Sequence, residues 1–318
     1  MRNLITGVGG FIGSFLLESL MQDGEEVLGM YYKPTIDMNE IQGDIELLEC
    51  DIRNQEIVFD IIYKYMPDRI YHLAAQSSVV KSWKNPSETI DINICGTINI
   101  FESIKKIRKY DKNYNPLVLV ACSSAEYGEV FNGCEKIKEN VELKPLSPYG
   151  VSKVGQDLIS YQYFINEHIN CIRARILNTT GPRKKNDVTS DFIRSAMFQK
   201  KNNISPIVLE VGNIDTYRAI LDYRDTVNAL KLLMEEGKEG EEYNISARNV
   251  YQIKDIINII EYYLGENIKI IKEKKLLRPS DEYIIYGDIT KISKDTLWKQ
   301  KISLEQTIKE MIDYWRKK

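Results

Sequence analysis

The feature of the sequence that most constrains its fold is a glycine-rich turn near the start. The chain runs from the apolar pair Leu4-Ile5 into Thr6-Gly7-Val8-Gly9-Gly10-Phe11-Ile12-Gly13, and an amphipathic segment follows from Ser14 through Leu20. A strand, a tight turn and a helix in this order aim the helix N-terminus at the turn, where backbone N–H groups attract phosphate. Because both flanking elements are present, the sequence predicts a dinucleotide-binding unit rather than a plain glycine-rich turn.

Strand and helix patterns then alternate through the first 180 or so residues. Apolar runs typical of buried strands occur at residues 26–30, 45–52, 69–76, 117–121 and 171–178, and helical runs at residues 55–65, 89–106 and 149–167. Repeated strand-helix-strand units imply a parallel sheet with right-handed crossovers, which binds ligands at the carboxyl ends of its strands. The predicted fold class is therefore α/β, a Rossmann-like doubly wound parallel sheet with a smaller C-terminal α/β lobe.

Beyond the last of these strands the regular alternation of strand and helix patterns ends. Lysine-rich loops, a helix and short apolar segments suggest a smaller lobe, and a later helix and strand return the chain to the sheet. We therefore predict a dinucleotide-binding domain of residues 1–177 with 219–247, and a substrate-binding lobe of residues 178–218 and 248–318.

Composition excludes several classes of protein. A chain of 318 residues with 43% hydrophobic residues can bury a large core. The net charge of −3, with basic residues scattered among acidic ones, gives no electrostatic footprint for nucleic acid. No apolar run approaches the ~18 residues of a membrane span, and the start shows no signal-sequence pattern. We expect a cytoplasmic protein with neither a nucleic-acid nor a membrane partner.

Cysteine and histidine content also limits the chemistry. The five cysteines form no CxxC pair, and their odd number argues against a disulfide framework. The two histidines, His72 and His168, are too few for a histidine-based metal site, so no metal is predicted. His72 lies in an apolar strand, where a hydrogen-bonded core histidine is the expected role.

A tyrosine and a lysine four residues apart form the strongest catalytic candidate. Tyr149 and Lys153 share a helix face, so the ammonium can stabilise the phenolate and lower the phenol pKa from its ordinary value of about 10. Such a pair can transfer a proton at neutral pH. The spacing alone is not specific, because Tyr314 and Lys318 repeat it near the C-terminus without other chemical residues around them.

The end of the second predicted strand bears on the choice of cofactor, NADP or NAD. The strand runs into Tyr31-Tyr32-Lys33, without the Asp or Glu that binds the ribose 2′-hydroxyl in NAD-preferring sites. Lys33 can instead meet a 2′-phosphate, which slightly favours NADP. The alternative is a lysine that is only solvated at a strand end.

Several motifs, in this order and at this spacing, resemble the extended short-chain dehydrogenase/reductase family. They are Thr6-Gly7-x-x-Gly10-x-x-Gly13, Leu73-Ala74-Ala75, Asn93, Ser123 and Tyr149-x-x-x-Lys153. Further segments resemble the branch that acts on GDP-linked sugars, the GDP-mannose 4,6-dehydratases and GDP-6-deoxy-4-ketohexose reductases. They are Gln76-Ser77-Ser78-Val79, Asn178-Thr179-Thr180-Gly181-Pro182, Val188-Thr189-Ser190-Asp191-Phe192, Val211-Gly212-Asn213 with Arg218, and Arg278-Pro279-Ser280.

The resemblance implies a role for each of these residues. Tyr149 would be the acid/base, Lys153 would bind the nicotinamide ribose and lower the Tyr149 pKa, and Ser123 would hydrogen-bond the reacting oxygen. The implied cofactor contacts are Gly7, Gly10, Phe11, Ile12 and Gly13 at the pyrophosphate, Asp51 and Ile52 at the adenine, and Leu73, Ala74 and Ala75 on the nicotinamide side, with Asn93 as a further contact. The implied substrate contacts are Gln76, Ser124, Asn178, Val188, Arg218 and Arg278, although either arginine could instead join the domains through a salt bridge. A homodimer through the helices around Thr89 and Tyr149 is also implied.

One departure from the family separates reduction from dehydration. The 4,6-dehydratases use a Glu two residues after the catalytic Ser or Thr, and this chain has Ala125 there. Glu126 follows, but neighbouring residues in an extended segment point to opposite sides. Ketone reduction needs no such carboxylate. It needs hydride, a proton from Tyr149 and polarisation by Ser123.

The expected function is NAD(P)H-dependent reduction of a nucleotide-linked 4-keto-6-deoxyhexose, with GDP-4-keto-6-deoxymannose the favoured substrate. The alternatives are a GDP-mannose 4,6-dehydratase or nucleotide-sugar 4-epimerase, and a non-catalytic nucleotide-sensing protein on the same fold. Two further departures bear on the substrate. Ala219 stands where relatives often carry Asp, and Arg183-Lys184-Lys185 replaces a small glycine-containing loop.

Overall fold

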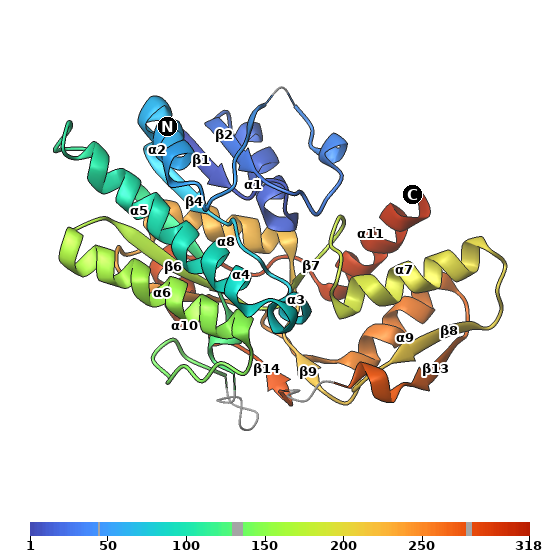
Figure 1. Ribbon diagram of the computed structural model, residues 1–318. Coiled ribbons are helices and arrows are strands. Elements are labelled where there is room, and N and C mark those ends of the chain that lie inside the picture. The colour runs from blue at the N-terminus through green and yellow to red at the C-terminus, as the bar shows by residue number, and fades with distance from the viewer. Residues whose placement is uncertain (44, 129–135, 278–281) are drawn as a thin grey trace.

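The computed structural model describes residues 1–43, 45–128, 136–277 and 282–318. At its centre lies a seven-stranded sheet in the order β11-β6-β5-β4-β1-β2-β3 (Figure 1). The strands are β1 (Arg2–Thr6), β2 (Glu26–Tyr31), β3 (Glu46–Glu49), β4 (Arg69–His72), β5 (Leu117–Ser123), β6 (Cys171–Ile176) and β11 (Glu242–Ile245). Every neighbouring pair is parallel, which confirms the predicted Rossmann-like α/β sheet.

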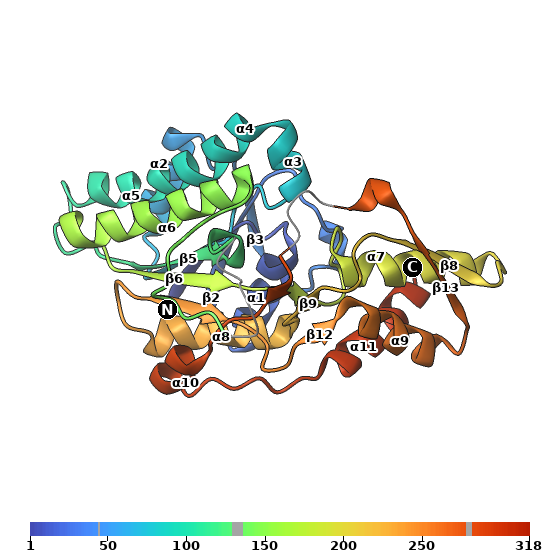
Figure 2. The same ribbon diagram turned by 90° about the horizontal axis from the view of Figure 1, so that it is seen from below.

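Helices cover both faces of this sheet (Figure 2). One layer contains α2 (Gln55–Tyr65), α5 (Gly96–Ile107) and α6 (Pro148–Glu167), and the other contains α1 (Phe11–Gln22), α8 (Tyr223–Glu236) and α10 (Thr290–Thr296). Each layer packs its apolar side chains into a separate core cluster against the sheet. None of the helices in the described ranges combines the length and the apolar character needed to span a bilayer.

Helix α2 shows how closely local sequence can set an element. Asn54 caps it by accepting the Ile57 N–H, and Met66 ends it in the left-handed region with a φ of 47°. Buried side chains at Val58 and Ile62 lie one turn apart and face the core. The helix has the bounds that the sequence predicts, because the cap and the apolar spacing agree.

The helix predicted over residues 89–106 is less regular than the sequence suggests. It is built from α4 (Pro86–Ile90), a π-helical turn (Asp91–Cys95) and α5. A π-helical turn widens the helix locally and is common at functional sites. Hydrophobic periodicity does not predict such a turn. The side chain of Asn93, which lies in the turn, forms its hydrogen bonds with distant parts of the chain.

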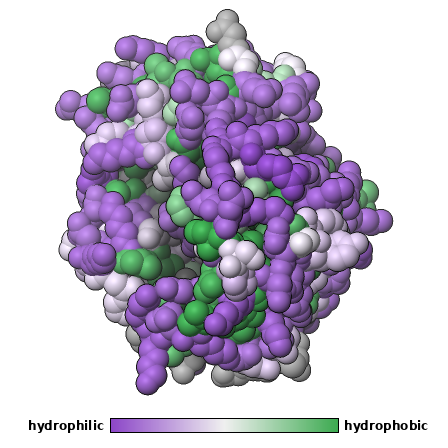
Figure 3. Space-filling view, turned by 90° about the vertical axis from the view of Figure 1, so that its right-hand side faces the viewer, coloured by the Kyte–Doolittle hydropathy of each residue, from purple (hydrophilic) through white to green (hydrophobic). Residues whose placement is uncertain are grey.

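A second, smaller core lies beyond the main sheet. It is formed by α7 (Val188–Lys201), β8 (Ile207–Val211), α9 (Ile253–Leu264), β13 (Ile268–Lys272) and α11 (Leu304–Arg316), with β8 and β13 paired in parallel. Figure 3 faces this end of the molecule and shows a mostly hydrophilic surface with apolar side chains gathered in a hollowed area. Ile292 and Trp298, late in the chain, pack instead with the core of the main sheet. The domain boundaries at residues 177, 218 and 247 stay a prediction.

Candidate active site

The predicted site residues gather at the carboxyl edge of the sheet. Strand β1 ends at Thr6, β4 at His72 and β5 at Ser123. Thr6 and His72 pair in register across β1 and β4. The strand order reverses between these two strands, and ligands of doubly wound sheets bind at such a switch point.

The glycine turn packs too tightly for side chains. Gly7 has a φ of 82° and donates its N–H to the Met30 carbonyl at 2.8 Å. A Cβ on Gly13 would lie 2.2 Å from the Gly7 carbonyl oxygen, and one on Gly7 would lie 2.7 Å from the Ala74 nitrogen. Gly10, the N-cap of α1, brings no side-chain acceptor, and the first turn of α1 holds no acidic residue. This cradle fits the pyrophosphate of a dinucleotide.

The backbone on either side of the turn is equally close. Phe11 and Ile12 form the first turn of α1, whose initial N–H groups have no partner within the helix. On the β4 side, the N–H of Leu73 donates to the Thr6 carbonyl at 3.2 Å. The Ala74 N–H donates to the Thr6 hydroxyl at 3.1 Å, and the partly buried Ala75 follows. The predicted pyrophosphate and nicotinamide segments are therefore neighbours.

The predicted adenine corner holds a bidentate ion pair that sequence reasoning missed. Arg53 Nε lies 3.0 Å from Asp51 Oδ1, and Arg53 Nη2 lies 2.6 Å from Asp51 Oδ2. Hydrogen bonding from Arg53 lowers the pKa of Asp51, with a smaller contribution from Lys33. Lys33 is exposed and places its ammonium 4.9 Å from the centroid of the Tyr32 ring, while Ile52 is buried. The Asp-x-Arg spacing is the signal that could have revealed this pair.

Two of the predicted ligand contacts are used inside the protein. Asn93 Oδ1 accepts the Gln76 N–H at 2.7 Å, and Asn93 Nδ2 donates to Ser152 Oγ at 2.8 Å. The Gln76 side chain accepts the Ser78 N–H at 2.7 Å and donates to Thr89 at 3.0 Å. Buried amides need such partners, so Asn93 and Gln76 brace the segment after β4 instead of facing an open site.

Ser123, Tyr149 and Lys153 come together between β5 and α6. The Ser147 side chain caps α6 and Pro148 opens it, which puts Tyr149 in the first turn. There the Tyr149 phenol hydrogen-bonds Ser123. Burial raises the pKa of Tyr149 to about 12, and the Ser123 hydrogen bond offsets this only in part. A phenol in this state is protonated at neutral pH and can donate its proton.

Lys153 does not lower the pKa of Tyr149 in this arrangement. Its side chain is 3% exposed, and its ammonium donates to the Ala121 carbonyl at 2.8 Å and to Gln156 Oε1 at 2.6 Å. These bonds hold the Nζ atom 6.0 Å from the centroid of the Tyr149 ring. Burial also lowers the pKa of Lys153 itself. Burial of the two groups therefore outweighs the lowering of the Tyr149 pKa that the sequence predicts.

A chain of buried hydrogen bonds links Lys153 to the glycine turn. Gln156 Nε2 donates to Thr97 Oγ1 at 2.9 Å, and Thr97 Oγ1 lies 2.9 Å from His72 Nε2. His72 Nδ1 in turn lies 2.8 Å from the Thr6 hydroxyl. Burial lowers the pKa of His72 to about 3, so the imidazole is neutral. The expected core histidine is confirmed, whereas no motif pointed to Gln156 or Thr97.

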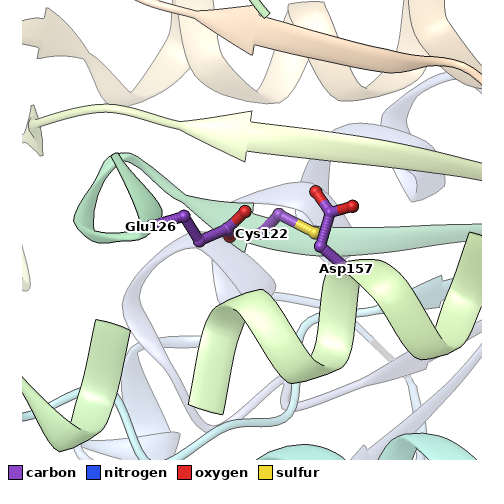
Figure 4. A group of neighbouring side chains, drawn as sticks. All are labelled: Cys122, Glu126 and Asp157. Atoms are coloured by element: carbon purple, nitrogen blue, oxygen red, sulfur yellow. The ribbon is translucent and has the colours of Figure 1, made fainter. Parts of the chain in front are cut away.

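A cluster of acidic side chains and a thiol lies beneath these residues (Figure 4). Cys122, Glu126 and Asp157 are all buried, with their ligand atoms within 4.8 Å of one another. Asp157 accepts from Arg173 at 2.6 Å and from Arg175 at 2.9 Å, and Arg175 Nε lies 3.4 Å from Glu126. Guanidinium groups thus balance the carboxylates. We assign the cluster to the buried framework that supports α6.

Glu126 points into the protein because of a turn, whereas the sequence predicts an extended segment. Residues 124–126 form a 3-10 turn rather than an extended segment. Within it the Ser123 N–H donates to Glu126 Oε1 at 2.7 Å, and the Ala125 N–H donates to Ser123 Oγ at 3.2 Å. The carboxylate is fully buried, so it does not replace the Glu that the dehydratases carry at the position of Ala125.

Three of the predicted substrate contacts lie at the ends of elements, Ser124 after β5, Asn178 after β6 and Val188 at the start of α7. Ser124 is partly exposed beside Ser123, and Val188 opens α7 directly after its cap Asp187. Asn178 follows β6, and its Nδ2 atom is buried without a hydrogen-bond partner among the described residues. A buried amide without a partner is uncommon. Its N–H group fits an oxygen acceptor supplied by a ligand.

Of the two arginines assigned to the substrate, Arg218 lies among the described residues. Arg218 lies in β9 (Tyr217–Arg218) and donates to the backbone oxygens of Tyr217 at 2.8 Å and Glu282 at 2.9 Å. Its side chain is partly buried at the edge of the smaller core. Arg278 lies outside the described residues.

Comparison with known proteins identifies the same architecture. Residues 4–311 match the family described as GDP-mannose 4,6 dehydratase. The chain is 25% identical to the GDP-6-deoxy-D-mannose reductase of Pseudomonas aeruginosa, over 99% of this chain and 97% of that protein. It is 31% identical to a putative UDP-glucose 4-epimerase of Methanocaldococcus jannaschii, over 98% of each chain.

A solved structure of RMD from Pseudomonas aeruginosa complexed with NADPH has the same fold, with a TM-score of 0.83 at 24% identity over 99% of both chains. One classification follows from the glycine cradle, the Tyr149–Lys153 helix and the family match over nearly the whole chain. This chain belongs to the extended short-chain dehydrogenase/reductase family and is an NAD(P)-dependent enzyme that modifies a nucleotide sugar.

Proposed function

We propose that the protein reduces a nucleotide-linked 4-keto-6-deoxyhexose, with GDP-4-keto-6-deoxymannose as the substrate and NADPH or NADH as the reductant. The observation that carries this proposal is the surroundings of Ser123. Ala125 offers no carboxylate, and Glu126 is buried and bonded to the Ser123 N–H. A 4,6-dehydratase needs a carboxylate at this place to move protons at C5 and C6. The similarity to a GDP-6-deoxy-D-mannose reductase over 99% of the chain supports the same choice.

Tyr149 is placed to supply the proton that reduction needs. Its phenol lies in the first turn of α6 and hydrogen-bonds Ser123, and ketone reduction requires a protonated acid at the carbonyl oxygen. The nicotinamide supplies the hydride when it is bound. Tyr149 donates the proton to the carbonyl oxygen, Ser123 polarises that oxygen through its hydroxyl, and Lys153 holds the nicotinamide ribose. Asn178 Nδ2 donates to the substrate.

A preference for NADP follows from the corner near β2. No carboxylate ends this strand, and the exposed Lys33 follows it. Its ammonium favours a 2′-phosphate over a free hydroxyl. Isothermal titration should therefore show tighter binding of NADPH than of NADH, and the reverse order would contradict the preference.

The second candidate is a nucleotide-sugar 4-epimerase. It is favoured by the 31% identity to a putative UDP-glucose 4-epimerase, over 98% of each chain. Such an enzyme would retain its oxidised cofactor through purification and would need no added reductant.

The deciding experiment offers the purified protein three substrates. With GDP-4-keto-6-deoxymannose and NADPH or NADH, we expect nicotinamide oxidation and a product heavier by two hydrogens. Loss of water from GDP-mannose without added reductant would make the protein a dehydratase. Interconversion of UDP-glucose and UDP-galactose would make it an epimerase, and either result would overturn the proposed reduction.

We also propose a homodimer that forms through the outer face of α6. Val151, Leu158 and Ile165 are 48%, 53% and 48% exposed. Their spacing of seven residues aligns them along one face of the helix, as in helix-helix interfaces. Trp83, in α3 (Val79–Lys84), is 60% exposed, and α3 packs against α6.

A further inference from the structure

The loop that precedes α7 is fixed to helix α1 by one buried arginine. Arg183, 9% exposed, donates to Glu18 at 2.8 Å, to Ser14 Oγ at 3.2 Å and to the Glu40 carbonyl at 2.7 Å. Its guanidinium carbon also lies 4.3 Å from the centroid of the Phe15 ring. These partners lie on α1 and on the segment after β2. They therefore fix the loop in place beside the dinucleotide turn.

This anchoring brings the next residue to the start of α1. The ammonium of Lys184 lies 4.9 Å from the centroid of the Phe11 ring, and Phe11 is the first residue of α1 after the N-cap Gly10. Lys184 also donates its backbone N–H to the Gly181 carbonyl at 3.3 Å. Arg183 pairs with two carboxylates, whereas Lys184 forms no ion pair with any residue in the described part of the chain.

We propose that Lys184 binds the diphosphate of the nicotinamide dinucleotide and adds a side-chain cation to the N–H cradle of α1. The ammonium rests against an aromatic ring beside a helix N-terminus that has no acidic residue in its first turn. A charge-assisted hydrogen bond to phosphate is stronger than a cation–π contact. A bound diphosphate therefore draws the flexible lysine away from Phe11, and the helix dipole and the ammonium act on the same anion.

The chemistry of the site favours the cofactor over the sugar nucleotide as the source of this diphosphate. The anchor Arg183 contacts Ser14 and Glu18, and both lie on α1, as Phe11 does. The inference goes beyond the proposed function and rests on it only through the need for a nicotinamide cofactor.

The test measures binding without turnover. Isothermal titration compares NADPH, ADP and GDP on the full-length protein, its Lys184→Ala variant and the matched control Lys185→Ala, which removes the same charge from the exposed neighbouring position. We expect Lys184→Ala to weaken the binding of NADPH and ADP about tenfold, or ~1.4 kcal/mol. Lys185→Ala should stay within about twofold of wild type, and GDP binding should not change beyond that in either variant.

Two further variants separate charge from structure. Lys184→Gln keeps a polar stem over Phe11 and should lose the same affinity, while Lys184→Arg should recover most of it. Unchanged NADPH binding in both Lys184→Ala and Lys184→Gln would overturn the proposal. So would a loss of GDP binding with NADPH binding intact, because the lysine would then serve the sugar nucleotide. Failure of the proposed reductase activity would alter none of these titrations.

Discussion

Burial holds Tyr149 as a neutral phenol, and its hydrogen bond to Ser123 only partly offsets this effect. Replacing it with Phe removes the proton donor without disturbing the cap of α6. We expect Tyr149→Phe to lose at least ~100-fold in turnover while its affinity for the cofactor stays unchanged. Steady-state kinetics and cofactor titration measure the two effects.

The chain provides its own control for this experiment. Tyr314 has the same spacing to a lysine, but its phenol donates to Glu40 Oε2 at 2.7 Å and not to Ser123. Tyr314→Phe should turn over at close to the wild-type rate. If Tyr149→Phe also stays within a few-fold of wild type, the assignment of Tyr149 as the acid is wrong.

His72 makes the stability of the fold depend on pH. Its pKa is about 3 in the folded protein and 6.5 when unperturbed, so the unfolded chain binds more protons between these values. Stability is therefore present above pH 6.5 and is lost as the pH falls towards 3. Between pH 7 and pH 5 the loss from His72 alone is ~2 kcal/mol.

Urea unfolding at the two pH values measures this loss. His72→Gln should lower stability at both, yet shrink the difference between pH 7 and pH 5 by ~2 kcal/mol. His168→Asn, at the exposed end of α6, controls for the loss of one histidine. An unchanged difference in His72→Gln would show that the imidazole is not kept neutral by the fold.

Among the helices, α6 presents two different sets of side chains on its opposite faces. Its inner face presents Tyr149, Lys153 and Gln156 to the site, and its outer face carries the apolar stripe of Val151, Leu158 and Ile165. The inner residues follow the three- and four-residue spacing of a helix, and the outer ones the seven-residue spacing. A change on the outer face should therefore leave the chemistry in place.

Leu158→Glu tests the proposed interface. A charge in the middle of the stripe costs desolvation in a dimer and nothing in a monomer. We expect light scattering after gel filtration to give a dimer for the wild type and a monomer for Leu158→Glu. Tyr262→Glu in α9, which is 79% exposed, should remain dimeric. A monomeric wild type, or a dimeric Leu158→Glu protein, would refute the interface.

At the scale of the whole molecule, one ionic network joins distant parts of the chain. Arg183 pairs with Glu18 of α1 and with Glu40, and Glu40 also pairs with Lys318 just beyond α11 at 2.9 Å. The side chains of Arg183, Glu18 and Glu40 are 9%, 14% and 17% exposed, so removing one partner leaves poorly solvated charges.

Arg183→Met should lower the free energy of unfolding by ~3 kcal/mol or more, measured by urea denaturation. Adding Glu18→Gln should restore part of that loss, because it removes one of the carboxylates left without a partner. The exposed pair Lys272 and Asp215 is the control, since Lys272→Met should change stability by less than ~1 kcal/mol. If Arg183→Met and Lys272→Met lowered stability equally, the buried network would contribute no more than an exposed ion pair.

Features that depend on residues close together in the chain could be predicted from the amino-acid sequence. The glycine turn, the alternation of strands and helices, the bounds of α2 and the pairing of Tyr149 with Lys153 on one face of α6 could all be predicted. Each follows from backbone geometry and side-chain periodicity, which act over a few residues. The parallel sheet followed as well, because short right-handed crossovers leave few other topologies.

Long-range packing sets which polar side chains find their hydrogen-bond partners inside the protein. Asn93 and Gln76 turn inward because the chain offers them partners 13 to 59 residues away, and Lys153 is held by Gln156 and a carbonyl of β5. Arg183 itself contacts residues up to 169 positions away. Local patterns cannot specify such contacts, because they form only when distant segments pack and every buried polar group must find a partner.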